Sequence, residues 1–221
     1  MRKFQIITLF PEVVEPYLNA GMLWKAQKES AVKFELINLR DFGLGPRRQV
    51  DDTVYGGGDG MLLMIEPLVA AIESAKKTQP SAKILLMTPS EHVWNQTDAE
   101  RYADANDDLI LVCGRYEGFD ARVEQFVDEK ISVGQYVLTG GELPAMTIID
   151  SIIRLIPGVL GGETSAEIES YSDGSNLEYP QYTRPENFRN IPVPDVLLSG
   201  NHAAVAKWRV KNSINPDRGR G

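Results

Sequence analysis

Cysteine and histidine are nearly missing from this sequence, which has one cysteine and two histidines in 221 residues. With Cys113 as the only thiol, a disulfide framework is excluded, and this usage is typical of a reducing, intracellular compartment. A zinc site built from Cys and His is equally disfavoured, because only Cys113, His92 and His202 are available. The same scarcity disfavours a Ser-His-Asp triad, so any chemistry must rest on other groups.

Long hydrophobic runs are also absent. No segment approaches the roughly 18 apolar residues that a membrane span needs. The first ten residues, MRKFQIITLF, are too short for a secretory signal and predict a first strand. Hydrophobic residues make up 43% of the chain and charged residues 24%, which is ordinary for a globular protein. We therefore expect a soluble, cytoplasmic protein with one medium-sized domain, or one domain and a small appendage.

Common nucleotide-binding motifs are missing as well. The sequence has no G-x-x-x-x-G-K-[S/T] loop, and no G-x-G-x-x-G follows the first expected strand. An ordinary nucleoside triphosphatase and a standard dinucleotide-binding enzyme are therefore disfavoured. The run GGGDG at residues 56–60 resembles a phosphate-binding loop but lacks the trailing lysine. By itself it predicts only a glycine-rich loop.

Charge is unevenly distributed along the chain. The formal net charge is −8, which is unusual for a protein that binds nucleic acid. Residues 184–221, however, contain seven basic and three acidic side chains, so this tail is about +4 and the rest of the chain about −12. The split indicates an anionic partner at one end of the chain, although a solvated basic helix without a partner would give the same balance.

The apolar pattern predicts an α/β fold. Apolar runs bounded by turn signals occupy residues 4–9, 32–39, 83–87, 109–112 and 133–138. Two of them, ILLM at 84–87 and LILV at 109–112, are continuous, as expected for strands buried on both faces of a parallel sheet. Helical periodicity occupies residues 11–29, 66–77, 95–105, 120–127 and 143–155. Such alternation predicts a parallel sheet with helices on its faces.

Periodicity stops between residues 158 and 185, in a stretch rich in Gly, Ser and Glu. At about 25 residues, this linker is longer than the loops that compact domains usually contain. A last helix is expected at residues 203–213, where Trp208 and several basic residues lie. The linker therefore separates an α/β domain from a small helical appendage.

Three of the expected strands end in similar turn-rich segments. These segments are Thr88-Pro89-Ser90, Gly114-Arg-Tyr-Glu-Gly118 and Thr139-Gly140-Gly141-Glu142. Because ligands of open parallel sheets bind outside the carboxyl ends of the strands, the three loops together predict a pocket. Their glycines would let the backbone approach a ligand closely, although glycine also suits a simple tight turn.

Seven segments then stand out by their order: RQVDD at residues 48–52 with YGGGDGM at 55–61, CGRYEG at 113–118, SVGQYVL at 132–138, GGELPA at 140–145, YPQYTRP at 179–185, and LSGNH at 198–202 followed by Trp208-Arg209. In this order they resemble the bacterial tRNA (guanine-N1)-methyltransferase family, known as TrmD. The resemblance extends over almost the whole chain.

The resemblance implies a SPOUT-type methyltransferase, whose α/β domain is threaded as a deep trefoil knot. It implies an S-adenosylmethionine-binding domain at residues 1–160, a linker at 161–185 and a shortened tRNA-binding helical domain at 186–221. The residues implied for the cofactor lie in the strand-end loops: Met87, Thr88, Pro89, Gly114, Tyr116, Glu117, Val133, Gly134, Gln135, Tyr136, Val137, Leu138, Gly140, Gly141 and Pro144.

The implied reaction moves a methyl group to N1 of guanosine 37 in tRNA, next to the anticodon. Guanine N1 carries a proton, so the reaction needs a general base near N1 and a cation near O6. Arg154 matches the family's O6-stabilising arginine. Glu169 stands where the family has an aspartate base. Its extra methylene shifts the carboxylate by about 1.5 Å, and a misplacement of about 1 Å in a catalytic group can lower the rate about a hundredfold. We expect Glu169 to act as the base, with Glu167 and Asp173 as alternatives.

Partners follow from the same resemblance. We expect a homodimer whose active sites are shared between subunits. The tRNA substrate is expected to bind through Asp51, Gly58, Arg184, His202 and Arg209. We expect neither DNA nor a membrane as a partner. No metal ligands are assigned, but the family's use of a divalent ion makes Mg²⁺ a second candidate group. Gln135 replaces the family's usual aspartate beside the methionine moiety. The chain stops at Gly221, soon after residues 212–216, whereas relatives usually continue for more helical turns. Part of the RNA-binding surface is therefore expected to be missing.

Two other interpretations stay open. The chain could be a degenerate relative that binds tRNA or cofactor without turnover, as Glu169, Gln135 and the short tail suggest. It could also be a SPOUT methyltransferase with a different RNA target, which YPQYTRP and LLSGNH in the substrate-facing half disfavour. Transfer of a labelled methyl group tests the first, and mapping of the modified base tests the second.

Overall fold

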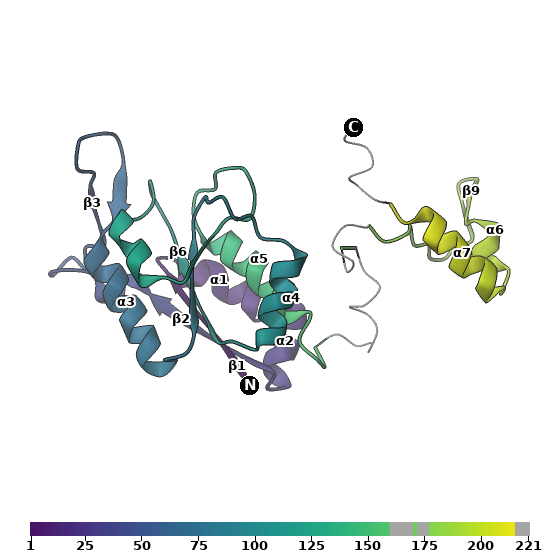
Figure 1. Cartoon of the computed structure of the whole chain (residues 1–221), viewed down its shortest axis with the longest axis horizontal. Helices are drawn as coiled ribbons and strands as arrows, with labels where there is room; N and C mark the ends of the chain where they lie inside the picture. The colour runs from purple at the N-terminus through teal and green to yellow at the C-terminus, as the bar shows by residue number, and fades with distance from the viewer. Residues whose placement is uncertain (160–169, 172–176, 215–221) are drawn as a thin grey trace. The chain divides into compact units, whose positions relative to one another are not determined.

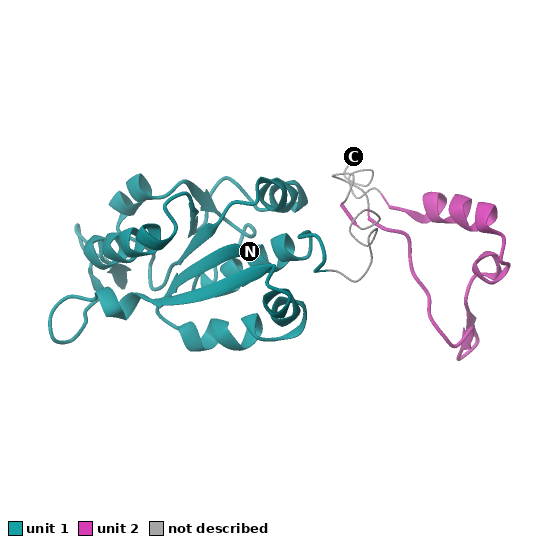
Figure 2. Cartoon of the chain, turned by 90° about the horizontal axis from the view of Figure 1, so that it is seen from below, with its two compact units in different colours: residues 1–161 teal, residues 162–221 magenta. Residues whose placement is uncertain are grey.

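The computed structural model describes residues 1–159, 170–171 and 177–214. The chain forms two compact units, residues 1–161 and 162–221, and each is described by itself (Figure 2). Within the described ranges, no helix combines the length and the apolar character that crossing a membrane requires.

The first unit is built on a parallel sheet of five strands in the order β2-β1-β6-β5-β7 (Figure 1). The strands are β1 (Arg2–Thr8), β2 (Val32–Asn38), β5 (Lys83–Met87), β6 (Leu109–Cys113) and β7 (Glu129–Ile131). This arrangement confirms the predicted α/β class and the first four predicted strands. At the carboxyl end of β5, Met87 pairs with Cys113 of β6 and with Ile131 of β7. Three neighbouring strands therefore end side by side.

Helices cover both faces of this sheet. One face carries α1 (Pro11–Leu18), α2 (Gly21–Lys28), α4 (Gln96–Ala105) and α5 (Glu142–Ile153). The other face carries α3 (Ile65–Thr78) and the 3-10 helices η1 (Leu39–Phe42) and η2 (Ala121–Phe126). The predicted helices at 66–77, 95–105 and 143–155 are thus confirmed as α3, α4 and α5.

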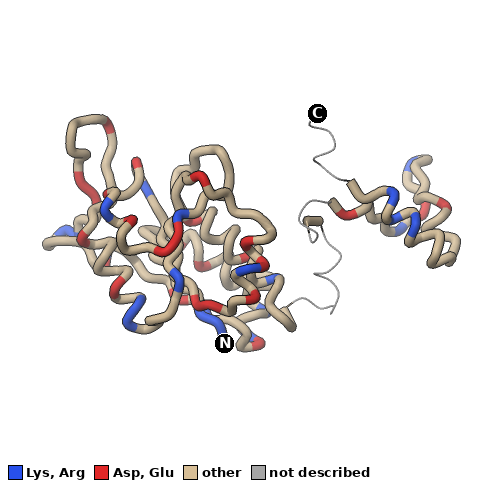
Figure 3. The backbone as a smooth tube through the Cα atoms, in the orientation of Figure 1, with Lys and Arg blue, Asp and Glu red and all other residues tan. Residues whose placement is uncertain are grey.

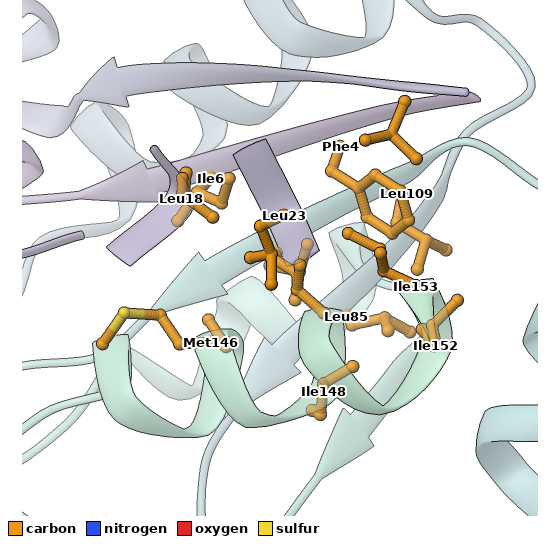
Figure 4. Close-up of a cluster of buried hydrophobic side chains, with 14 of the residues drawn as sticks. Phe4, Ile6, Leu18, Leu23, Leu85, Leu109, Met146, Ile148, Ile152 and Ile153 are labelled. Carbon is orange, nitrogen blue, oxygen red and sulfur yellow. The ribbon is translucent and has the colours of Figure 1, made fainter. Parts of the chain in front are cut away.

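The three inner strands, β1, β5 and β6, each contribute to two hydrophobic cores. Leu85 of β5 packs in the core beneath α5, whereas Leu86, the next residue, packs in the core beneath α3. Figure 4 shows the first core, in which Leu85 of the sheet lies near Ile148 and Ile152 of α5. Because both faces are covered, successive residues must all be apolar, which explains the continuous runs in the sequence.

The predicted strand at residues 133–138 is wrong. The last strand of the five-stranded sheet, β7, ends at Ile131, and residues 133–138 form an irregular loop after it. The Ser132 hydroxyl donates a hydrogen bond to the Gly134 carbonyl at 2.8 Å, which turns the backbone at the end of the strand. Val137 is 86% exposed. The apolar run was therefore not a sign of burial between two layers.

Two predicted helices also need correction. The segment 11–29 forms two helices instead of one. The first helix ends with Asn19 as its C-cap, and Gly21 adopts a left-handed φ of 54° where the second begins. The segment 120–127 forms the 3-10 helix η2 instead of an α-helix. There the Val123 amide donates to the Asp120 carbonyl three residues earlier, and the Asp120 side chain accepts from the Arg122 amide at 3.0 Å.

A β-hairpin accompanies the sheet and was not predicted. Its strands are β3 (Asp51–Thr53) and β4 (Met61–Leu63), and the GGGDG run lies in the turn between them. The Leu63 amide donates to the Gly118 carbonyl at 2.9 Å, and the Asp120 amide donates to the Leu63 carbonyl at 3.0 Å. The hairpin therefore holds the loop that follows β6.

The second unit contains the hairpin β8 (Asn187–Phe188) and β9 (Ile191–Pro192), followed by α6 (Asp195–Leu198) and α7 (His202–Asn212). The Asn201 side chain caps α7 by accepting from the Ala204 amide at 3.1 Å, and α7 confirms the predicted last helix. None of the described residues of this unit is buried. Basic residues gather along α7 (Figure 3).

Candidate active site

A pocket lies at the sheet edge where β5, β6 and β7 end. Its walls are the loops that follow these three strands and the first turn of α5. The lining residues are Met87, Thr88, Pro89, Gly114, Arg115, Tyr116, Glu117, Gly118, Phe119, Ile131, Ser132, Val133, Gly134, Tyr136, Val137, Leu138, Thr139, Gly140, Gly141 and Pro144. Parallel pairing of the strands brings these segments together although they are distant in sequence.

The cofactor residues expected from the sequence all line this one pocket, except Gln135. Six further residues line the pocket and were not among the expected cofactor residues: Arg115, Gly118, Phe119, Ile131, Ser132 and Thr139. Arg115, Gly118 and Ser132 belong to the motifs, and Arg115, Gly118 and Thr139 to the predicted pocket loops, so the boundaries of these segments could have indicated them. The strand assignment at 133–138 was wrong, but that segment still forms a wall of the pocket, now as a loop.

Glycine is required where two pocket loops touch. A Cβ atom on Gly141 would lie 2.7 Å from the Cα of Cys113 and 2.7 Å from the amide nitrogen of Gly114. The Gly141 amide donates to the Gly114 carbonyl at 2.9 Å. Since φ at Gly141 is −86°, the restriction is one of space and not of backbone conformation. The two loops thus meet backbone to backbone.

Exposed apolar side chains form another part of the pocket wall. Val137 is 86% exposed, Tyr136 59% and Leu138 40%, and all three line the pocket. Apolar side chains left open beside a few polar groups are typical of small-molecule sites. The Tyr136 hydroxyl donates to the Val133 carbonyl at 3.2 Å, which holds this loop in its folded shape.

A buried ion pair lies behind the pocket. Glu142 is 1% exposed, and its carboxylate accepts a hydrogen bond from the Thr8 hydroxyl at 2.7 Å and contacts the Arg115 guanidinium at 2.8 Å. Burial, and secondarily the Glu142 carboxylate, raises the pKa of the nearby Cys113 thiol well above its usual range. Cys113 therefore stays protonated at neutral pH and is not a candidate nucleophile.

None of the expected catalytic and RNA-binding residues that the structure describes lines the pocket. Arg154 is the C-cap residue of α5, at the end of that helix opposite to the pocket. Glu169 lies outside the described residues, as do Glu167 and Asp173. Asp51 and Gly58 belong to the β3–β4 hairpin of the first unit.

The remaining RNA-binding candidates belong to the second unit. His202 and Arg209 both lie on α7 and line one shallow hollow together with Tyr179. The Arg209 guanidinium stands 4.8 Å above the Tyr179 ring. Arg184 precedes the β8–β9 hairpin and does not line that hollow.

The fold and the pocket define a three-layer α/β protein with a ligand site at the carboxyl ends of adjacent parallel strands. Comparison with known families makes this specific. Residues 2–219 match the family model described as tRNA (Guanine-1)-methyltransferase TrmD. The chain belongs to this family.

Individual relatives agree with the family match. The chain is 49% identical over 217 residues to a tRNA (guanine-N(1)-)-methyltransferase of Geobacter sulfurreducens, covering 98% of this chain and 88% of that protein. It is 46% identical over 218 residues to one of Nostoc punctiforme, covering 99% and 91%. The crystal structure of tRNA (m1G37) methyltransferase from Aquifex aeolicus superposes with a TM-score of 0.78 at 35% identity, covering 94% of this chain and 87% of that one.

Proposed function

We propose that this protein transfers a methyl group from S-adenosylmethionine to N1 of guanosine 37 in tRNA. One observation carries the proposal: in a chain that belongs to the TrmD family, nearly all the residues expected to hold the cofactor line a single pocket. A protein of the same fold that did not bind the cofactor would not need these residues around one cavity.

The pocket suits S-adenosylmethionine in shape and polarity. Val137 and Leu138 offer an apolar surface for adenine, and the backbone at Gly114, Gly140 and Gly141 lines the opposite side. Bare backbone can donate and accept hydrogen bonds with a ligand at close range. When bound there, S-adenosylmethionine supplies an electrophilic methyl group on its sulfonium.

The protein's own groups must then manage the proton on guanine N1. A carboxylate within about 2.6–3.2 Å of N1 can accept it, and Glu169 is our candidate. Negative charge grows on O6 as the proton leaves, and a guanidinium placed there stabilises it. Arg154 is the candidate for that role.

The position of Arg154 supports a shared active site. Helix α5 begins at the pocket with Glu142 and ends before Arg154, which caps it. At 1.5 Å per residue, the ten residue steps from Pro144, which lines the pocket, to Arg154 span about 15 Å along the helix. Arg154 cannot easily reach a substrate in the pocket of its own chain. We infer that Arg154 of a second copy completes each site in a homodimer.

The knot and the cytoplasmic location are also part of the proposal. The trefoil knot is a proposal, supported by the return of residues 139–141 to the end of β6, where Gly141 bonds to Gly114. A cytoplasmic location follows from the proposed tRNA substrate. For Mg²⁺, no cluster of three or more His, Cys, Asp or Glu able to hold a metal occurs among the described residues.

Methyl transfer to a tRNA transcript tests the proposal. The natural chain should label a transcript that carries guanosine 37, and primer extension should stop at that base because N1 is blocked. Arg154→Ala and Glu169→Ala should each lower the rate by about a hundredfold or more, as expected for loss of an electrostatic or acid–base group. Arg40→Ala, an exposed arginine after β2, is the matched control and should keep full activity. Binding of tRNA and cofactor without any transfer would instead favour the degenerate relative.

Coexpression of two inactive variants tests the shared site. Arg154→Ala is paired with Val137→Glu, which blocks the pocket. In a heterodimer with shared sites, one site receives an intact pocket and an intact Arg154, so random pairing should restore about a quarter of the activity. Sites contained within single chains would restore none.

A further inference from the structure

Glu142 is a buried carboxylate that the proposed reaction does not use. It is the first residue of α5, and only 1% of it is exposed. Acidic residues are favoured at a helix N-terminus by the helix dipole. Full burial of a charge nevertheless costs several kcal/mol unless partners compensate it, so the position calls for an explanation.

The partners of Glu142 come from two other segments of the chain. The Thr8 hydroxyl, at the end of β1, donates to one carboxylate oxygen at 2.7 Å. The Arg115 guanidinium, from the loop after β6, lies 2.8 Å from the other oxygen. The Thr8 hydroxyl also accepts from the Phe10 amide at 2.9 Å, so its orientation is fixed.

Arg115 in turn joins the two pocket loops. Its side chain donates to the Thr139 carbonyl at 3.3 Å, and its backbone pairs with Gly140 in a β-bridge. The guanidinium also stands 4.5 Å above the Phe10 ring. The fit is close, because a Cβ on Gly140 would lie 2.4 Å from Nε of Arg115. Arg115, Thr139 and Gly140 all line the pocket.

We propose that Glu142 is a positioning residue, which holds Arg115 so that the loop after β6 and the loop before α5 keep the spacing needed to bind S-adenosylmethionine. This inference rests on the proposed function for the identity of the ligand. Thr8 does not line the cavity itself, so its hydroxyl acts on the pocket through its hydrogen bonds to Glu142 and to the amide of Phe10, whose ring packs against the Arg115 guanidinium.

Hydrogen exchange in the ligand-free protein tests the positioning directly. Glu142→Gln keeps the shape of the side chain and removes its charge, which leaves the Arg115 guanidinium uncompensated. We expect the Gly141 amide, which bonds to Gly114 across the two loops, to exchange about tenfold faster or more. Amides of α3 should keep their rates. Unchanged exchange at Gly141 would overturn the inference.

Cofactor affinity, measured by calorimetry on variants that circular dichroism shows to be folded, gives a second test. Glu142→Gln should weaken S-adenosylmethionine binding by about tenfold or more. Thr8→Val, which removes only the hydroxyl, should weaken it by about fivefold. The matched control is Thr78→Val on α3, whose hydroxyl also bonds to backbone and side chain but away from the pocket. It should leave the affinity unchanged.

The double variant separates an indirect from an independent role. If Thr8 acts through Glu142, then Thr8→Val combined with Glu142→Gln should bind no more weakly than Glu142→Gln alone. Fully additive losses, or no loss in either single variant, would contradict the inference. If the natural chain itself fails to bind S-adenosylmethionine, the proposed function is wrong, and the exchange experiment still decides the role of Glu142.

Discussion

At the scale of single residues, the pocket depends on the absence of a side chain at Gly141. Gly141 ends the loop before α5 and bonds directly to Gly114, which begins the loop after β6. The neighbours of its absent Cβ include backbone atoms, which cannot move aside as the end of a flexible side chain could. The close contact of the two loops is therefore built into this position.

Gly141→Ala should consequently disturb both stability and binding. The added methyl group would push the two loops apart, and overpacking of this kind costs about 1–3 kcal/mol of unfolding free energy. Urea denaturation measures that loss, and calorimetry should show S-adenosylmethionine binding weakened by about tenfold. The comparison variant is Gly21→Ala, where φ is 54° but the space is open. It should cost about 1 kcal/mol through backbone strain and leave the affinity intact. Equal affinities for both variants would show that the loop contact does not shape the site.

Single residues also mark the limit of what the sequence could predict. The motif residues could be predicted to gather in one pocket, because strand ends and family motifs coincide at Gly114 and Gly140. The role of Glu142 could not, because its partner Thr8 lies 134 positions away and nothing local reveals the contact. Burial of a charged residue becomes visible only when the chain is folded.

At the scale of elements, hydrophobic runs predicted four of the five strands of the parallel sheet. β1, β5 and β6 lie inside the sheet and matched their runs closely. β7 is an edge strand of three residues with charged Glu129 and Lys130, so its own run is too short to detect. The neighbouring run at 133–138 is apolar because it lines the pocket, and a single sequence cannot distinguish that reason from burial in a sheet.

The edge strand β7 is held to α4 by a polar cluster that makes stability depend on pH. Arg101 donates to both carboxylate oxygens of Glu129 at 3.1 Å, and the Tyr102 hydroxyl donates to one of them at 2.8 Å. Chiefly because of the Arg101 hydrogen bond, the pKa of Glu129 is lowered from its usual value. A lowered pKa stabilises the fold above the unfolded-state pKa of about 4.3, and this contribution disappears as the pH falls through the folded-state pKa.

Glu129→Gln should therefore lower the unfolding free energy at pH 7 by about 1 kcal/mol, a modest value because Arg101 is half-exposed. At an acidic pH well below the unfolded-state glutamate pKa of about 4.3, protonation of the natural carboxylate removes its charge, so the difference between variant and natural chain should shrink. Urea denaturation at both pH values measures it. Glu73→Gln, an exposed position on α3, should show no difference at either pH. A gap that persists or widens in acid would contradict the ionic origin.

At the scale of the whole molecule, positive charge is concentrated near the end of the chain. The acidic excess lies in residues 1–183, while the tail from residue 184 has seven basic and three acidic side chains. Lys207, Arg209 and Lys211 all lie on α7, where no described residue is buried. The overall charge of −8 therefore conceals a basic region suited to phosphate contacts.

This division predicts that tRNA binding depends on salt mainly through the second unit. Each phosphate contact contributes about 0.7–0.9 to the slope of log affinity against log salt concentration, because a counterion is released. Arg184→Gln and Arg209→Gln should each reduce the slope by a little less than one and weaken binding to different tRNA sequences alike. Filter binding over a salt series measures both effects. Lys77→Gln, an exposed lysine at the end of α3, removes the same charge from the first unit and should leave the slope unchanged. A flat salt dependence of the natural chain, or an equal loss in Lys77→Gln, would show that the basic tail does not provide the contacts.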